Sequence, residues 1–135
     1  MVRRSGQARN LVVGEETFRW TVGHAHDVDE SRVVGRYQDC REILTLRRRG
    51  AAGRVWLVFR DGPGRLVPDG ILHSGAVGTT GGDWLNLHEP GTARALLDQV
   101  RADGWDPGDP RTRHLDGWPL FDAVVARRSA GTARP

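Results

Sequence analysis

Lysine is absent from this chain of 135 residues, and all 20 of its basic residues are arginines. Without lysine the chain cannot form the Gly-x-x-x-x-Gly-Lys phosphate-binding loop. It also lacks the Gly-x-Ser-x-Gly nucleophile elbow and the His-Glu-x-x-His metalloprotease motif. The specific sequence signatures of these hydrolytic enzymes are missing, which favours a non-enzymatic protein without excluding an enzyme.

Cysteine is nearly absent, since Cys40 is the only one. It cannot form a disulfide within the chain, and no paired Cys-x-x-Cys zinc motif is present. This cysteine usage is typical of a reducing compartment, and we expect a cytoplasmic protein. Because Cys40 lies between Asp39 and Arg41 just ahead of a strand-like run, we interpret it as a structural thiol rather than a nucleophile or a metal ligand.

Long apolar runs are also lacking, and no run approaches the roughly 20 residues that span a bilayer. The N-terminus carries no apolar stretch of signal-peptide length, so we expect a soluble protein without a membrane partner. A chain of 135 residues is near the commonest size for one domain. Residues 1–10 and 127–135 are polar and without periodicity, so we predict flexible tails on either side of a single domain at 11–126.

Alternating apolar residues predict a small antiparallel sheet. The best examples are 17–22, 41–47 and 54–60, and a polar link at 48–53 is typical of a hairpin loop. Two shorter strands are expected at 70–77 and 83–87, joined by a glycine-rich hairpin. Because the connections look too short for parallel crossovers, we predict an α+β fold with an antiparallel meander of about five strands.

One amphipathic helix is predicted from Pro90 to Asp103. Proline suits the first helical position, and Gly104 suits the helix end. Its apolar residues recur at the spacing of a single helical stripe, at Ala93, Leu96, Leu97 and Val100. We expect this helix to pack on one face of the sheet. The segment 118–126 could form a second short helix starting at Pro119, or a strand.

The segment around this helix reads Leu87-His88-Glu89-Pro90-Gly91-Thr92 at its start and Gly104-Trp105-Asp106-Pro107 at its end. It resembles a segment of small bacterial proteins of unknown function, of actinobacterial type, in which a Pro-Gly helix start precedes a helix ending in Gly-Trp-Asp-Pro. The resemblance covers roughly a sixth of the chain. The resemblance implies a sheet with a packed helix and implies no catalytic activity.

Histidines form the sharpest polar pattern. His24 and His26 are two residues apart, so on an extended strand their side chains share one face. With His73 and His88 on other predicted strands, they could converge on a divalent metal such as zinc, aided by an oxygen ligand from Asp27, Asp29 or Glu89. The favoured interpretation is that 23–31 is a solvated acidic loop with half-exposed histidines, in which case no metal or other cofactor is bound, and the metal site is the alternative.

A serine nucleophile is not predicted. Ser74 follows His73 in the sequence, but adjacent residues of a strand point to opposite faces. Adjacency in the sequence therefore does not indicate a catalytic pair.

Nucleic-acid binding has its best candidate in an arginine-rich hairpin. Arg47, Arg48 and Arg49 lie at its tip, and Arg54 flanks Trp56 on the following strand. Arginine pairs with phosphate, and an exposed aromatic ring can stack on bases. However, the net charge is only +3 and acidic residues are interleaved through most of the chain, so RNA or single-stranded DNA is not the favoured partner.

Five tryptophans supply the leading functional hypothesis. We place Trp20 and Trp105 in the core, and Trp56, Trp84 and Trp118 on a surface that could contact a partner. The sequence thus favours a non-enzymatic binding or accessory module that contacts a protein partner or a small ligand, or forms a homodimer. The metal-dependent enzyme and the nucleic-acid binder stay as alternatives.

Overall fold

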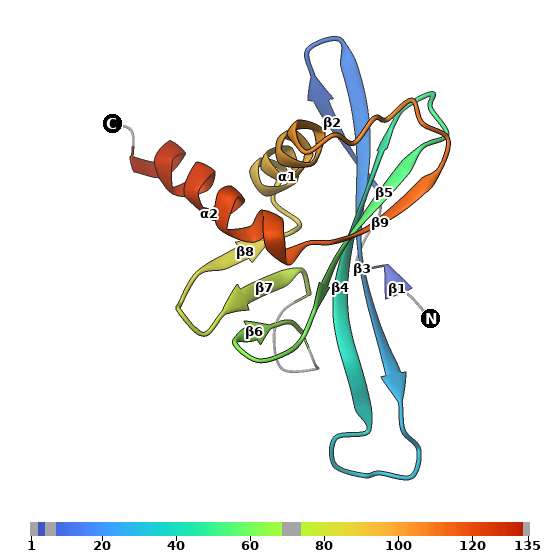
Figure 1. The fold of residues 1–135 in the computed structure, drawn as a ribbon, viewed down its shortest axis with the longest axis vertical. Coiled ribbons are helices and arrows are strands. Elements are labelled where there is room, and N and C mark those ends of the chain that lie inside the picture. The colour runs from blue at the N-terminus through green and yellow to red at the C-terminus, as the bar shows by residue number, and fades with distance from the viewer. Residues whose placement is uncertain (1–2, 5–7, 69–73, 134–135) are drawn as a thin grey trace.

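The computed structural model describes residues 3–4, 8–68 and 74–133, with side chains described for 8–68 and 74–129. The main sheet has the strand order β1-β3-β4-β5-β9, with β2 also paired to β3, and β6, β7 and β8 form a smaller sheet (Figure 1). The elements follow in the order β1 Arg3–Arg4, β2 Arg9–Val13, β3 Glu16–Val28, β4 Tyr37–Arg48, β5 Arg54–Arg60, β6 Arg65–Leu66, β7 Ala76–Thr79, β8 Trp84–Asn86, α1 Pro90–Ala102, β9 Thr112–Asp116 and α2 Trp118–Ala133.

The long β3–β4 hairpin forms the centre of the main sheet. Alternation places one set of side chains on an inner face, where Trp20 is paired with Leu46 and Val22 with Leu44. The strand β5 continues this face through Val55, Leu57 and Phe59, which are all fully buried. A one-residue slip would turn all of these apolar side chains toward solvent, so burial of this face specifies the register.

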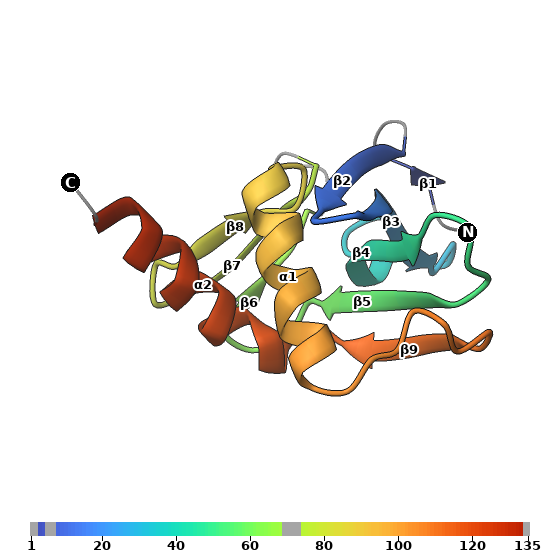
Figure 2. The same ribbon diagram turned by 90° about the horizontal axis from the view of Figure 1, so that it is seen from above.

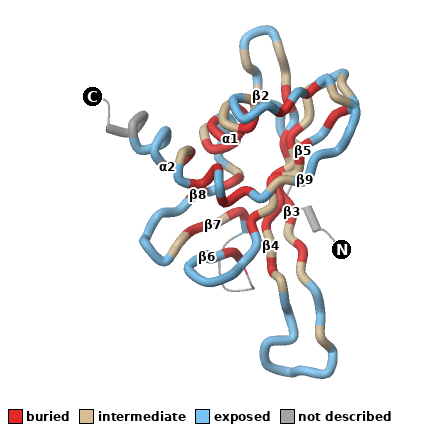
Figure 3. Tube along the Cα trace, in the orientation of Figure 1, coloured by how far each residue is buried: buried red, intermediate tan, exposed pale blue. Residues whose placement is uncertain are grey.

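Both helices and the smaller sheet lie on the inner side of the main sheet (Figure 2). Helix α1 buries six residues, namely Thr92, Ala93, Ala95, Leu96, Leu97 and Val100. Burying each large aliphatic side chain contributes about 1.5–3 kcal/mol, so the leucine pair and Val100 hold α1 firmly in place. Buried residues are concentrated in the region where these layers meet, and exposed residues occupy the far end of the β3–β4 hairpin (Figure 3).

The prediction of a mostly antiparallel α+β fold is confirmed, and the antiparallel pairing of consecutive strands extends over β2, β3, β4 and β5. The next strand to join the sheet is β9, which pairs with β5 in parallel. The segment 61–111 between them contains the smaller sheet and α1, and therefore forms the crossover that the sequence analysis did not find. The two strands expected at 70–77 and 83–87 are represented by the β7–β8 hairpin of the smaller sheet; residues 70–73 lie outside the described part.

The helix predictions are close to the structure. Helix α1 begins at Pro90 and ends at Ala102, and Gly104 follows it with φ +108°, a conformation that favours glycine. The segment at 118–126 is helical, and the helix α2 continues to Ala133. Regular structure thus enters both predicted tails, because β1 and the start of β2 lie within 1–10. No helix in the described residues is long and apolar enough to cross a membrane.

Candidate metal centre

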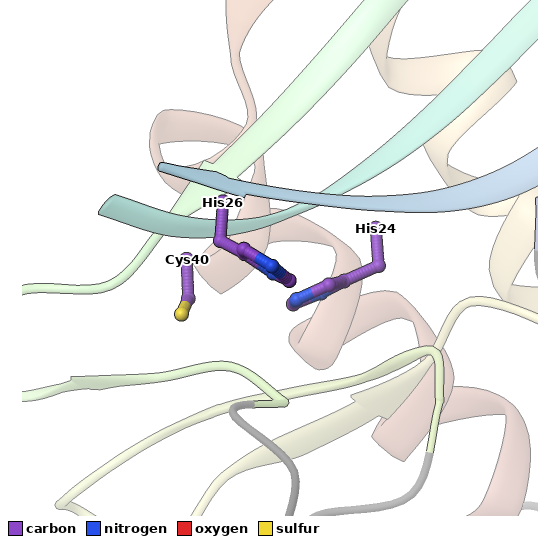
Figure 4. Close-up of side chains that lie close together, drawn as sticks. All are labelled: His24, His26 and Cys40. Atoms are coloured by element: carbon purple, nitrogen blue, oxygen red, sulfur yellow. The ribbon is translucent and has the colours of Figure 1, made fainter. Parts of the chain in front are cut away.

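Three potential metal ligands lie together on the inner face of the β3–β4 hairpin. They are His24 and His26 of β3 and Cys40 of β4 (Figure 4). One ligand atom from each side chain, an imidazole nitrogen or the sulfur, can be chosen so that all three lie within 4.8 Å of one another. Both histidines are half-buried, whereas Cys40 is only 2% exposed. The interpretation of 23–31 as a solvated loop with half-exposed histidines is correct for the histidines and for the residues after Val28, but 23–28 belongs to β3.

A β-bulge places Cys40 beside His26. Ala25 pairs with Arg41 and Asp27 with Gln38, so Asp39 and Cys40 together oppose His26. Asp39 is the only described non-glycine residue with positive φ, at +50°. Such backbone strain is retained where neighbouring groups enforce it, and the guanidinium groups of Arg41 and Arg60 both donate to the Asp39 carboxylate.

His24 is oriented by a buried carboxylate. Glu42 faces it across the strand pair and is fully buried, with His24 Nδ1 at 2.5 Å from Glu42 Oε1. The second oxygen, Oε2, accepts a hydrogen bond from the Gly75 backbone N–H at 3.0 Å. Burial raises the pKa of Glu42, and the hydrogen bonds from His24 and Gly75 act in the opposite direction. The carboxylate therefore has a partner at each oxygen, as a buried charge requires.

Gly75 can be replaced by no other residue without strain. Its φ is +83°, and a Cβ built there would lie 2.5 Å from His88 Cδ2. We expect Gly75→Ala to lower the free energy of unfolding by about 2 kcal/mol, from the left-handed backbone and the displaced imidazole. Urea unfolding measures this loss.

Gly82→Ala is the matched control for this prediction. Gly82 also has positive φ, at +99°, but a Cβ there would meet no atom within 4 Å. The backbone strain is common to both variants, so the difference between them reports the contact with His88. Equal losses in the two variants would contradict a role for that contact.

The donor set suits a borderline-soft transition metal. Zinc binds imidazole nitrogen at about 2.0 Å and thiolate sulfur at about 2.3 Å, so tetrahedral ligand atoms lie roughly 3.3–3.7 Å apart. The 4.8 Å limit observed here exceeds that separation by about 1 Å. Coordination of one ion would therefore require the three side chains to move closer together.

The other predicted ligands do not join the cluster. His73 lies outside the described residues. His88 follows β8, and its Nε2 lies 3.2 Å from Ser74 Oγ. Partial burial lowers the pKa of His88, with a smaller contribution from Arg9, and both favour the neutral imidazole. The structure thus pairs Ser74 with His88, a contact that the sequence analysis did not predict.

The oxygen ligands considered for the metal are engaged in other contacts or lie outside the cluster. Glu89 forms an ion pair with Arg128, and Asp29 accepts hydrogen bonds from Ser31. Asp27 Oδ1 lies 3.9 Å from Arg41 Nη1, and Asp27 does not belong to the cluster of His24, His26 and Cys40 found among the described residues. Glu42 is the carboxylate in contact with this site. It is hydrogen-bonded to His24 Nδ1 and is not a member of the cluster.

The predicted arginine patch is divided between the two faces of the sheet. Arg47 and Arg54 lie on the outer face with Trp56, whereas Arg48 turns inward and pairs with Glu16 at 3.2 Å. Arg49 is exposed in the loop after β4. The grouping of Arg48 with the others is therefore wrong, because neighbouring strand residues alternate between faces, whereas Arg49 is exposed in the predicted hairpin loop.

The tryptophans also separate into two groups. Trp20 and Trp105 are buried in the core as predicted, at 2% and 8% exposure. The placement of Trp118 on an interaction surface is wrong, since it is 6% exposed and packs edge-on against Phe59. Trp84 is 44% exposed, and Trp56 is half-buried against His114. The three do not form one aromatic surface.

Two members of the site were not predicted from the sequence. The sequence predicts Cys40 as a structural thiol and assigns Glu42 no role in a site. Both lie on the same strand face as Leu44 and Leu46, so alternation along β4 was the signal that could have placed them beside the histidines.

The donor set and its geometry are thus the basis for assigning a function. The chain offers two imidazoles, one thiol and a carboxylate that orients one imidazole. Comparison of the chain with protein-family models, with curated proteins and with solved structures gives no match.

Proposed function

We propose that this protein binds one transition-metal ion, Zn(II) by preference, through His24, His26 and Cys40. The observation that carries the proposal is the convergence of these three side chains on one face of the hairpin, with Glu42 behind His24. Thiolate and imidazole ligands suit zinc and copper and disfavour magnesium and calcium. Both histidines and the cysteine come from a rigid strand pair, which limits the cost of ordering the ligands.

Glu42 supports this proposal as a group that prepares His24 for a metal. When Glu42 is ionised, Nδ1–H of His24 donates to it, and Nε2 keeps its lone pair. Metal-bound histidines commonly donate their other N–H to a carboxylate, which sets the tautomer and increases the basicity of the ligand nitrogen.

Three protein ligands leave one tetrahedral position for water or an external ligand, the arrangement of catalytic rather than structural zinc sites. His73 is the residue that could change this assignment. Loss of zinc affinity in His73→Ala would indicate a closed site with four protein ligands. Unchanged affinity would indicate an open position.

Zinc titration of the metal-free protein tests the proposal. We expect one Zn(II) per chain, in competition with a chromophoric chelator, and loss of at least 100-fold in affinity for His26→Ala and for Cys40→Ser. The matched control is His114→Ala, because His114 lies on the outer face of the sheet and its loss leaves the cluster intact.

Cobalt and copper distinguish the metal and its ligands. Co(II) bound through Cys40 should show a thiolate charge-transfer band that is missing in Cys40→Ser. Cu(II) in the same titration tests whether copper binds with the same stoichiometry. No stoichiometric metal in the wild type, or equal binding by the three variants, would overturn the proposal.

A further inference from the structure

The outer face of the main sheet carries three arginines in one cross-strand row. Arg19 of β3 pairs with Arg47 of β4, and Arg47 pairs with Arg54 of β5. Their neighbours Phe18, Leu46 and Val55 are fully buried on the inner face, so the arginines project outward. Both helices lie on the other side of the sheet, which leaves this face uncovered by helices (Figure 2).

The described residues provide no acidic partner for these three arginines. Within the described part of the chain, none of Arg19, Arg47 and Arg54 makes an ion pair or a side-chain hydrogen bond. Other arginines do pair, in the contacts Arg41–Asp39, Arg60–Asp39, Arg48–Glu16, Arg101–Glu16, Arg94–Asp98, Arg111–Asp109 and Arg128–Glu89. Like charges directly opposite on adjacent strands destabilise a sheet. The row therefore costs stability in the free protein, and an anion would relieve that cost.

A shallow pocket lies along this row. It is lined by Ala8, Arg19, Thr21, Thr45, Arg47 and Arg54, and its volume is about 150 Å³. Its threonine hydroxyls add hydrogen-bond donors beside the guanidinium groups, and this set of donors suits a phosphate group.

An aromatic pair stands next to the arginine row. Trp56 follows Arg54 by two residues on the same face, and its ring stacks on His114 of β9 with centroids 4.7 Å apart and planes 22° apart. His114 is exposed, and β9 is the last strand of the sheet, so no further strand lies beside it. An exposed imidazole, stacked on Trp56, thus lies on the same face of the sheet as the basic pocket.

We propose that this outer face binds single-stranded nucleic acid, with Arg19, Arg47 and Arg54 on the phosphates and a base stacked on His114. Phosphate contacts together with aromatic stacking are the usual means of binding single strands without sequence preference. The basic hairpin tip considered from the sequence is replaced here by a row across three strands. The proposal is independent of the metal site, which lies on the opposite face.

Fluorescence anisotropy with a labelled oligothymidylate across a salt series tests this inference. For single strands, log K falls with log[salt] by about 0.7 per phosphate contact, so three contacts give a slope of about −2. Each change to glutamine at Arg19, Arg47 or Arg54 should reduce the slope by about 0.7 and weaken binding about eightfold near 0.05 M salt.

The matched control is Arg32→Gln, which removes the same charge in the loop at the opposite end of the β3–β4 hairpin (Figure 1). It should bind as the wild type does. His114→Ala should weaken binding about fivefold or more at unchanged salt slope, because stacking is lost and phosphate contacts remain.

Several results would overturn the proposal. These are no salt-dependent binding, equal losses for Arg32→Gln and Arg47→Gln, or tighter binding of a duplex than of the single strand. Equal binding of heparin with no effect of His114→Ala would indicate a general polyanion site instead. Binding to vesicles containing phosphatidylserine, without binding to the oligonucleotide, would assign the face to membranes.

Discussion

Cys40→Ser is expected to abolish the stabilisation of this protein by zinc. A ligand that binds only the folded state at 100 times its Kd adds about 2.7 kcal/mol of stability. For a chain of this size that corresponds to a rise in Tm of roughly 10 °C. Serine keeps the approximate size of the side chain but supplies no thiolate, so the variant should show almost no rise. Differential scanning fluorimetry with and without Zn(II) measures the shift.

The comparison has to be made within each variant. A buried serine hydroxyl in place of a thiol that is 2% exposed will itself lower Tm in the absence of metal. Cys40→Ala serves as the second variant, because it removes the ligand without introducing a polar group. A zinc-induced rise of the same size in both variants as in the wild type would exclude Cys40 as a ligand.

Glu42→Ala should cause the largest loss of stability among single changes at the site. It removes a fully buried carboxylate and leaves its two partners, the His24 imidazole and the Gly75 N–H, without their acceptor. Breaking a buried charged contact on one side typically costs about 3–5 kcal/mol. We expect a loss of about 3 kcal/mol in the free energy of unfolding, measured by urea denaturation.

Glu42→Gln separates the structural role of this residue from its role toward the metal. Glutamine keeps the shape of the side chain and an oxygen acceptor, so stability should stay within about 1 kcal/mol of the wild type. Zinc affinity should still fall about 10–100-fold, because the neutral amide cannot increase the basicity of His24 as a carboxylate does. A glutamine variant that binds zinc like the wild type would reduce Glu42 to a packing role.

The strands and the helix with strong periodicity were predictable. The run 54–60 alternates between buried and outward residues over its whole length, and β5 has the predicted bounds. Helix α1 combines proline at its start, one apolar stripe and glycine just beyond its end. Each of these signals is local, and the physical preference behind it acts within a few residues.

The strand β9 lacked such a signal. Four of its five residues are exposed, and only Leu115 is half-buried. An edge strand with little buried area has no alternating apolar pattern to detect. Its place depends on parallel pairing with β5 and on close packing after it, where a Cβ on Gly117 would lie 2.5 Å from the Phe59 ring.

The candidate metal centre was half predictable. The two-residue spacing of His24 and His26 placed them on one face, given a strand. Cys40 required the bulge at Asp39, and a bulge is set by the pairing of two strands rather than by either strand alone. The arginine row is a similar case, since Arg19 joins Arg47 only through the register of β3 and β4.

The sequence by itself determined the local elements and the face on which each side chain lies, because alternation and helical periodicity act between near neighbours in the chain. Only the tertiary structure decided which faces meet: the parallel partner of β5, the cysteine beside the histidines, the carboxylate behind His24 and the unpaired arginines in a row. These contacts join residues that are distant in the chain, and their positions follow from strand register and from burial of the common core.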